Sequence, residues 1–422
     1  MVAAAEAGTV EEIDLADWEP GYTADPYPFL ARLRGEAPVA RVRIQGVQAW
    51  LVTRYEDIRD GLSDPRLSND PMLADEATRA VPWVGASVAT ARHMLRVDPP
   101  DHTRMRGLVA RAFTPRRIER MRPRIQAIAD ELIDAIAPRG RADLVAEFAL
   151  PLPLTVISEL LGIPREERAV FVGWANVFFG VEEGDAARIV EARQWINRYL
   201  EALIEHRMHS HATRGVDAEQ GTLLDGLIAA RDAGDRLTSD ELIAMGFLLL
   251  VAGYETTVHL IGNGLASLLP QRDQYETLCR DPSLIRSAIE EFLRHEAPVK
   301  IAPFVRVATT PVELGGVTIL PGQPVLFALA AGNRDPAQFL DPDRLDITRA
   351  ERAHLAFGHG VHFCLGAPLA RLEAEIAFTT LLARCPDLAL AVASDALAWR
   401  TSRVVRGLKR LPVTFRAQPA AR

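Results

Sequence analysis

Apolar residues recur at three- and four-residue spacing along most of the chain, and this pattern predicts amphipathic helices. Helices are predicted over residues 102–113, 117–136, 152–161, 165–178, 185–209, 222–231, 239–269, 282–296 and 367–384, with a shorter one in ADPYPFLARLRGEAPV that ends near Gly35. Alternating apolar residues on either side of Gly46 predict a β-hairpin of Val39–Arg43 and Ala49–Val52. Short strands are also predicted at 304–308, 312–319 and 324–327 and near 412–415.

The order of these elements predicts a mainly α fold with a minor β part. Residues 1–12 have the composition of a loose terminal tail. Residues 13–422 contain no internal repeat and no low-complexity linker that would divide them. We therefore expect a single domain over 13–422.

The segment 239–269 is the longest predicted helix and has clear end signals. Thr238 and Glu241 have the spacing of a capping box, and Pro270 stops the helix. Its centre is almost entirely apolar, which is typical of a helix that is buried all round. Glu255 lies in that centre, and a buried acid there calls for a chemical reason.

Composition and charge exclude several classes of function. The net charge of −8 argues against nucleic acid as the main partner, because phosphate binding needs a basic surface. The N-terminus has no basic segment typical of a secretory signal, and the apolar run Ile243–Gly253 is shorter than the roughly 20 residues that span a bilayer. We expect a soluble, cytoplasmic protein with no membrane partner.

Three cysteines are too few and too scattered for a disulfide framework. Cys279 and Cys385 lie in apolar helical stretches and are interpreted as small buried hydrophobes. Cys364 differs, because Gly360 and Gly366 flank it and Pro368 opens a helix just after it. The N–H groups at a helix N-terminus favour a thiolate there.

The loop around Cys364 resembles the haem-binding signature of the cytochrome P450 family, Phe-x-x-Gly-x-(His/Arg)-x-Cys-x-Gly. Phe357, Gly360, His362, Cys364 and Gly366 match it completely. The resemblance implies the cytochrome P450 fold and haem b (iron protoporphyrin IX) bound through the sulfur of Cys364, with Phe357 and Gly366 against the cofactor. The alternative is a glycine-rich turn that holds a structural cysteine.

The segment Ala252-Gly-Tyr-Glu-Thr-Thr257 resembles the oxygen-activating segment of the same family. Thr256 can donate a hydrogen bond to the carbonyl of Ala252 and open the helix locally. The resemblance implies that Thr256 and Glu255 are catalytic and deliver protons during oxygen activation. Tyr254 departs from the family's usual His or Phe. For an isolated motif, simple helix packing would be the alternative.

Two further groups of residues match the family. His102 and Arg106 are four apart on one helix face, and the resemblance implies that they bind the haem propionates together with Arg306 and His362. Glu291 and Arg294 are three apart and match the family's structural Glu-x-x-Arg pair. The resemblance implies that an arginine from a later loop joins this pair, and Arg344 is predicted for that position.

The function implied is that of a haem-thiolate monooxygenase that hydroxylates or epoxidises a bulky, largely apolar molecule, either macrolide- or polyketide-like or steroid-like. By position in the family, the substrate pocket is predicted to contain Trp83, Met94, Phe178, Leu249, Ala252, Val299, Ile301, Phe304 and Val404. No dinucleotide fingerprint is present, so the electrons are expected from a separate ferredoxin and its reductase. Arg104, Arg111, Arg116 and Arg117 form either an attractive surface for that ferredoxin or a solvated basic face.

Three other functions stay open at this point. The same fold can act as a peroxygenase or an aromatic-coupling oxidase, but peroxide-driven relatives usually lose the acid–alcohol pair that Glu255 and Thr256 provide here. A non-catalytic haem sensor or carrier would normally have a second domain. A haem-free helical scaffold would show no Soret band after expression with ample haem.

Overall fold

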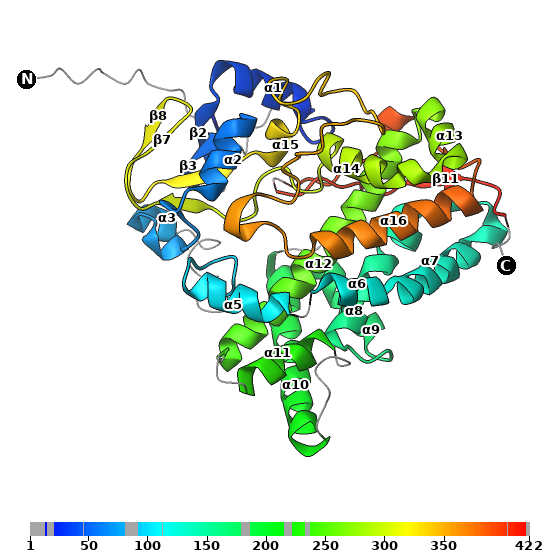
Figure 1. Ribbon diagram of the computed structural model, residues 1–422, viewed down its shortest axis with the longest axis horizontal. Helices are drawn as coiled ribbons and strands as arrows, with labels where there is room; N and C mark the ends of the chain where they lie inside the picture. Colours follow the sequence, from blue (N-terminus) through cyan, green and yellow to red (C-terminus); the bar gives the residue numbers. More distant parts are fainter. Residues whose placement is uncertain are drawn as a thin grey trace, which may run out of the picture.

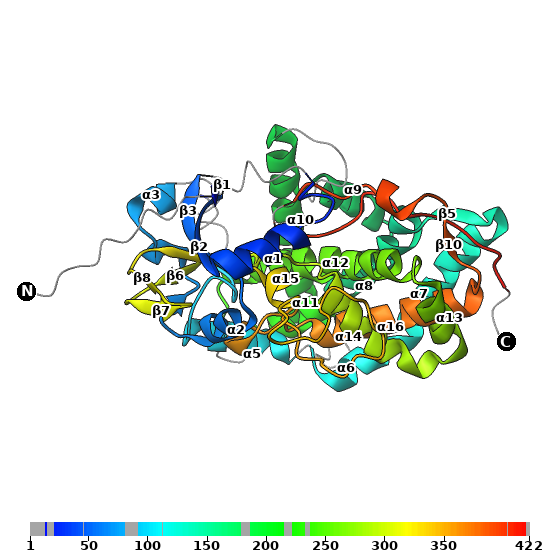
Figure 2. The ribbon, with the colours of Figure 1, turned by 90° about the horizontal axis from the view of Figure 1, so that it is seen from above.

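The structure, a computed structural model, describes residues 13–14, 21–44, 46–80, 92–111, 113–178, 186–214, 222–232, 237–402 and 404–418. Most of these residues are helical, and the mainly α fold with a minor β part is confirmed. A β-rich part and a helical part lie at opposite ends of the molecule (Figures 1 and 2). The predicted tail, residues 1–12, lies outside the described residues, and the single-domain boundary stays a prediction.

The described helices follow the apolar periodicity closely. They are α1 (Tyr27–Glu36), α2 (Tyr55–Ser63), α3 (Glu76–Ala80), α5 (Asp101–Ala110), α6 (Pro115–Arg120), α7 (Arg122–Ile136), α8 (Pro151–Leu161), α9 (Arg168–Phe178), α10 (Ala186–Arg214), α11 (Leu223–Asp232), α12 (Ser239–Leu268), α13 (Arg272–Arg280), α14 (Ile285–His295), α15 (Leu329–Gly332) and α16 (Ala367–Arg384). The predicted helix 117–136 is divided, because Pro123 begins a new helix at α7. The prediction missed α2, α3, α13 and α15, which are all short.

The strands form one large sheet and two small ones. They are β1 (Ile13–Asp14), β2 (Val39–Ile44), β3 (Val47–Val52), β4 (Leu67–Ser68), β5 (Arg141–Asp143), β6 (Arg306–Ala308), β7 (Val312–Leu314), β8 (Val317–Ile319), β9 (Pro324–Phe327), β10 (Ala389–Leu390) and β11 (Pro412–Thr414). The large sheet has the order β1-β2-β3-β9-β6-β4, and the small ones are β10-β11-β5 and β7-β8.

The predicted hairpin at Gly46 is confirmed as β2 and β3, which pair antiparallel from Val39↔Val52 to Ile44↔Val47. The segment 312–319, predicted as a strand, is instead a tight hairpin of β7 and β8. Gly315 and Gly316 turn it with φ values of 53° and 81°, which suit glycine.

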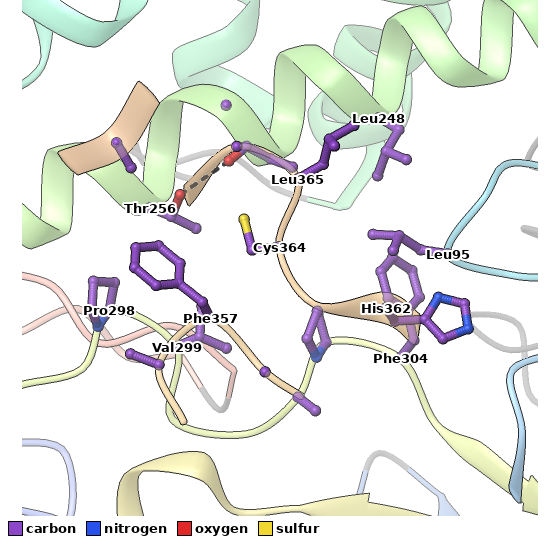
Figure 3. A pocket seen from close by; sticks show the side chains of 18 of the residues that line it. Leu95, Leu248, Thr256, Pro298, Val299, Phe304, Phe357, His362, Cys364 and Leu365 are labelled. Carbon is purple, nitrogen blue, oxygen red and sulfur yellow. Dashed lines mark hydrogen bonds between the residues drawn. The ribbon is translucent and has the colours of Figure 1, made fainter. Parts of the chain in front are cut away.

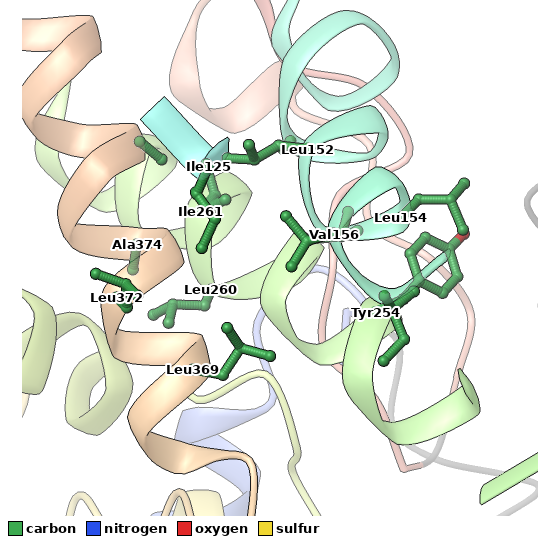
Figure 4. Packing of buried hydrophobic residues seen from close by; sticks show 14 of the residues in the cluster. Ile125, Leu152, Leu154, Val156, Tyr254, Leu260, Ile261, Leu369, Leu372 and Ala374 are labelled. Atoms are coloured by element: carbon green, nitrogen blue, oxygen red, sulfur yellow. The ribbon is translucent and has the colours of Figure 1, made fainter. Parts of the chain in front are cut away.

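Helix α12 crosses the centre of the molecule (Figure 1). The predicted capping box is confirmed: the Glu241 N–H donates to Thr238 Oγ1 at 3.1 Å, and the Thr238 N–H donates to Glu241 Oε2 at 2.9 Å. Leu260 and Ile261 of α12 pack between α8 and α16 (Figure 4). In length and composition the stretch Asp240–Leu268 would fit a membrane span, but 65% of its most apolar window is buried within the protein, as expected of a core helix.

A buried charge cluster joins α14 to the loop that follows α15. Arg294 Nε donates to Glu291 Oε2 at 2.7 Å, which confirms the predicted pairing of these side chains. The third member is Arg349, whose Nε lies 3.2 and 3.1 Å from the two carboxylate oxygens of Glu291.

The prediction of Arg344 for this cluster is therefore wrong. The Arg344 side chain is exposed, and only its carbonyl faces inward, where it accepts hydrogen bonds from Arg294 and Arg349. The turn closed by the Arg344 N–H on the Asp341 carbonyl sets this direction. It places the backbone of Arg344, and not its guanidinium, against the cluster.

Candidate active site

An apolar cavity lies between the middle of α12 and the loop that precedes α16 (Figure 3). Cys364 from that loop and Thr256 from α12 both line it. Figure 3 shows the Cys364 sulfur pointing into the cavity from the side opposite α12. The lining is mostly apolar with few polar groups, which is typical of a site for a mostly apolar ligand.

The backbone of the cysteine loop fixes the direction of the sulfur. The Cys364 N–H donates to the Phe357 carbonyl at 2.9 Å and closes the loop. Gly358 and Gly360 both have φ of 72°, a conformation that side chains rarely adopt. A Cβ at Gly360 would also lie 2.8 Å from the Leu62 carbonyl oxygen. Glycine is thus required at 360 for two independent reasons.

Two opposing effects act on the Cys364 thiol. Burial raises its pKa, and hydrogen bonds from the N–H groups of Gly366 and Ala367 lower the pKa without cancelling that effect. The N–H groups at the start of α16 thus act on the thiol in the predicted direction. A metal ion coordinated by the sulfur would deprotonate the thiol outright.

Four residues predicted to bind the propionates lie together at one side of the cavity, called its polar side here. His102 and Arg106 come from α5, Arg306 from β6 and His362 from the cysteine loop. The rings of His102 and His362 lie 4.2 Å apart between centroids. Arg306 Nη1 donates to the Leu67 carbonyl at 3.0 Å, and Arg106 Nη2 donates to the Phe363 carbonyl at 2.7 Å.

These groups fit the two propionates of a haem. All four ring nitrogens of His102 and His362 are buried, and none has a hydrogen-bond partner among the described residues. Burial lowers the pKa of His362 to about 3, and the charges of Arg306 and Arg106 contribute in the same direction. Burial also lowers the pKa of Arg306 to about 10. Carboxylates placed among such donors would form charge-assisted hydrogen bonds.

On the α12 side, Thr256 makes the predicted hydrogen bond. Its Oγ1 donates to the Ala252 carbonyl at 3.0 Å, drawn as a dashed line in Figure 3. Thr256 lines the cavity, whereas Glu255 is not among the residues that line it. Oε1 of Glu255 instead lies 3.7 Å from Nε2 of His259, one turn further along the helix.

Behind the cysteine loop lies a cluster that the sequence reasoning missed. Arg371 Nε and Nη2 donate to the two oxygens of Glu290 at 2.7 Å each, and His354 Nε2 lies 3.1 Å from Glu290 Oε2. Although burial opposes it, these partners hold the pKa of Glu290 down to about 2. The Arg371 guanidinium lies 4.6 Å from the centre of the Phe357 ring and thereby supports a cavity residue.

Five of the residues predicted for the substrate pocket line this cavity, and their contact with a substrate stays a prediction. Met94, Leu249, Ala252, Val299 and Phe304 line the cavity. Trp83 and the side chain of Phe178 lie outside the described residues.

Ile301 and Val404 do not line the cavity as described, so those two predictions are wrong. Ile301 is 1% exposed and packs in the core of α1, β2 and β3. Val299, two residues earlier, lines the cavity instead. The Val404 carbonyl accepts the Lys300 N–H at 2.7 Å, so Val404 connects two segments.

Comparisons with known proteins agree with this geometry. The family model Cytochrome P450 matches residues 280–386. The cytochrome P450 monooxygenase PikC of Streptomyces venezuelae is 48% identical over 408 residues, which cover 96% of this chain and 94% of PikC. The vitamin D(3) 25-hydroxylase of Pseudonocardia autotrophica is 46% identical, with 93% and 94% covered. The structure of the bacillaene polyketide synthase cytochrome P450 PksS of Bacillus subtilis 168 aligns with a TM-score of 0.85, 39% identity, and 94% and 98% coverage.

Proposed function

Because this chain belongs to the cytochrome P450 family and is a monooxygenase of that family, we propose that it hydroxylates or epoxidises a bulky, largely apolar small molecule. The proposed cofactor is haem b with Cys364 as the iron ligand. One observation carries this proposal: Cys364 and Thr256 line the same apolar cavity from opposite elements.

In the proposed site, the chain's own residues hold the haem at two places. Cys364 supplies the sulfur ligand, while His102, Arg106, Arg306 and His362 bind the propionates. When bound, the haem iron activates molecular oxygen for insertion of one of its atoms into the substrate.

The proposed catalytic pair supplies protons. Insertion of one oxygen atom with reduction of the other to water consumes two electrons and two protons. Thr256 stands at the cavity wall with its hydroxyl anchored on the Ala252 carbonyl, so its position is fixed. Glu255, directly before it, is proposed to exchange protons with solvent and pass them to the hydroxyl of Thr256.

The proposed substrate is polyketide-like, of which macrolides are one kind, or steroid-like. Met94, Leu249, Val299 and Phe304 give the cavity an apolar lining suited to such molecules. The printed names of two relatives point to the same classes: PksS belongs to a polyketide synthase, and a second relative hydroxylates vitamin D(3).

The proposed electron donor is a ferredoxin served by a reductase, in the cytoplasm. Arg111 and Arg116 are exposed around the junction of α5 and α6 and provide positive charge for an acidic partner. Arg104 is less suited, since its Nη2 lies 2.7 Å from Oε1 of Glu241. The proposed basic surface thus contains fewer arginines than the four predicted from the sequence.

The test uses the purified holoenzyme and a panel of macrolides, other polyketides and steroids. We expect members of one class to shift the spin state of the ferric iron, and to yield one oxygenated product with ferredoxin, reductase and NAD(P)H. Turnover with peroxide alone, without turnover from the ferredoxin system, would favour the peroxygenase alternative. Carbon monoxide binding without oxidation of any compound would favour a haem sensor.

A further inference from the structure

His259 is a buried polar residue on α12 that the proposed proton route does not yet use. Its side chain is 2% exposed, and its Nε2 lies 3.7 Å from Oε1 of Glu255. That distance is too long for a direct hydrogen bond. Among the described residues, Nε2 has no hydrogen-bond partner. A buried polar atom without a hydrogen bond is energetically unfavourable, so the placement of this imidazole beside Glu255 calls for an explanation.

The C-terminal segment holds the imidazole in place. A Cβ at Gly407 would lie 2.0 Å from Nδ1 and 2.1 Å from Cε1 of His259, so only glycine permits so close an approach. Asn263, one turn further along α12, fixes the same segment by donating to the Arg406 carbonyl at 2.9 Å. His259 is therefore confined between its own helix, α12, and the C-terminal segment around Gly407. The side chain of Glu255 is 17% exposed and less confined.

The surroundings favour the neutral form of His259. Burial lowers the pKa of His259, and the charge of Arg400 acts in the same direction, while Glu255 opposes both. Glu255 on α12 and Arg400 on the C-terminal segment are the charged groups that act on the ring among the described residues. A neutral imidazole can donate one N–H to a carboxylate without adding a counter-charge.

We propose that His259 is a positioning residue for Glu255. A small rotation of the carboxylate brings Oε1 within hydrogen-bond distance of an Nε2–H donor, which orients Glu255 beside the turn of Thr256. In each transfer Glu255 gains one proton from solvent and gives one to the hydroxyl of Thr256, while His259 neither gains nor loses a proton. This role rests on the proposed function, because it serves the same acid–alcohol pair.

The test compares His259→Met, which keeps a side chain of similar length without a donor, with His259→Gln, which keeps a donor. Holoenzymes are assayed with ferredoxin, reductase, NAD(P)H and a compound that shifts the spin state. The quantity measured is product formed per NAD(P)H consumed, as a function of pH. For His259→Met we expect a loss on the order of tenfold, as for the loss of an outer hydrogen-bond partner, and an altered pH profile. His259→Gln should retain most of the coupling.

Controls separate positioning from structure. Asp240→Asn, an exposed acid on α12, should behave as wild type. All variants should keep the thiolate-type carbon monoxide spectrum and the substrate-induced spin shift. Should His259→Met fail to bind haem, His259→Leu replaces it in the same comparison.

Wild-type coupling and pH profile in the Met variant would overturn the role of His259, as would an equal loss in the Met and Gln variants. Thr256→Ala tests the proposed proton route separately from the role of His259. If Thr256→Ala also leaves coupling unchanged, the proposed proton route itself is wrong. If Thr256→Ala uncouples the reaction and His259→Met does not, only the role of His259 is wrong.

Discussion

Arg306 illustrates at the scale of one residue how the polar side of the cavity is built. Its side chain is buried, and its Nη1 donates only to a backbone carbonyl, that of Leu67. Among the described residues, Asp98 is the carboxylate whose charge acts on it, and that charge does not cancel the effect of burial. Burial lowers its pKa to about 10, which reflects the cost of holding a cation in this place. A propionate would offset that cost.

Arg306→Met should therefore weaken the retention of haem. Loss of a hydrogen bond to a charged group costs about 1.5–3 kcal/mol, roughly 10- to 100-fold in affinity. The measurement is the rate of haem transfer to an excess of a haem-scavenging protein. Arg344→Met, which changes an exposed arginine, serves as the control. Equal retention by the two variants would exclude Arg306 as a propionate partner.

Arg349 and Arg344 show where residue-level prediction fails. Both are arginines of the loop after α15, and local spacing does not distinguish them. The choice depends on a turn that directs the carbonyl of Arg344 inward and on the Glu291 carboxylate, which is distant in sequence. By contrast, the pairing of Glu291 and Arg294 follows from their spacing on one helix.

Substitution of Arg349 and substitution of Arg344 should have unequal effects on the free energy of unfolding. Arg349→Met should lower the free energy of unfolding by about 3 kcal/mol, because it removes one partner of a buried ion pair. Arg344→Met should stay within about 0.5 kcal/mol of wild type, as expected of an exposed site. Chemical denaturation of both holoenzymes measures the difference. A larger loss in Arg344→Met would restore the original assignment.

At the scale of elements, α12 connects the core with the site. Its ends are set by local signals, the Thr238 cap and Pro270, while its centre supplies Thr256 to the cavity. Gly264 lets α16 and α14 approach, since a Cβ there would lie 2.7 Å from Phe378 and 3.0 Å from Phe292. A substitution at the start of α12 should thus change the stability of the protein as a whole.

Thr238→Ala should lower the free energy of unfolding by about 1 kcal/mol, the usual value of an N-cap hydrogen bond. The matched control is Thr114→Ala, because Thr114 is the N-cap of α6 but makes no side-chain capping hydrogen bond. The difference between the two denaturation midpoints isolates the capping hydrogen bond. Equal midpoints would mean that packing alone fixes the start of α12.

Long helices with strong end signals were predictable, and short ones were not. The prediction of 239–269 for α12 is correct to within one residue. Helix α13 buries only Tyr275 and Leu278, too few apolar residues to stand out from a charged stretch. The division between α6 and α7 did have a signal in Pro123, which the apolar periodicity obscured.

At the scale of the molecule, the cavity lies where the β part meets the helical part. Arg306 reaches it from the large sheet, Thr256 from the central helix, and Cys364 from the loop before α16. All three residues were predicted from the sequence, because each matches a position of the family. Residues such as Glu290 and His354 carry no motif, and their contacts with Arg371 appear only when α14, the loop and α16 pack together.

Acid should destabilise the protein partly through Glu290. Its pKa is about 2 in the folded protein, below the ordinary value of 4.5, so its contribution to stability is complete above about pH 4.5 and is lost as the pH falls toward 2. Glu290→Gln should cost about 1–2 kcal/mol at pH 7, after allowance for partial solvent exposure.

The measurement is the denaturation midpoint of wild type and Glu290→Gln at several pH values from 7 downward. The gap between the two proteins should narrow below about pH 4.5. Glu131→Gln, an exposed acid with 67% of its side chain accessible, should show no such gap. A difference in midpoint that stays constant with pH would mean that Glu290 stabilises the protein by packing and not by its charge.

The central claim is that the sulfur of Cys364 binds the haem iron, and the reduced carbon monoxide difference spectrum tests it most directly. Wild type and Cys279→Ala, a matched change at another cysteine, should both give the thiolate-type band. Cys364→Ala should lose that band even where it still binds haem. A thiolate-type band that survives in Cys364→Ala would contradict the ligand assignment.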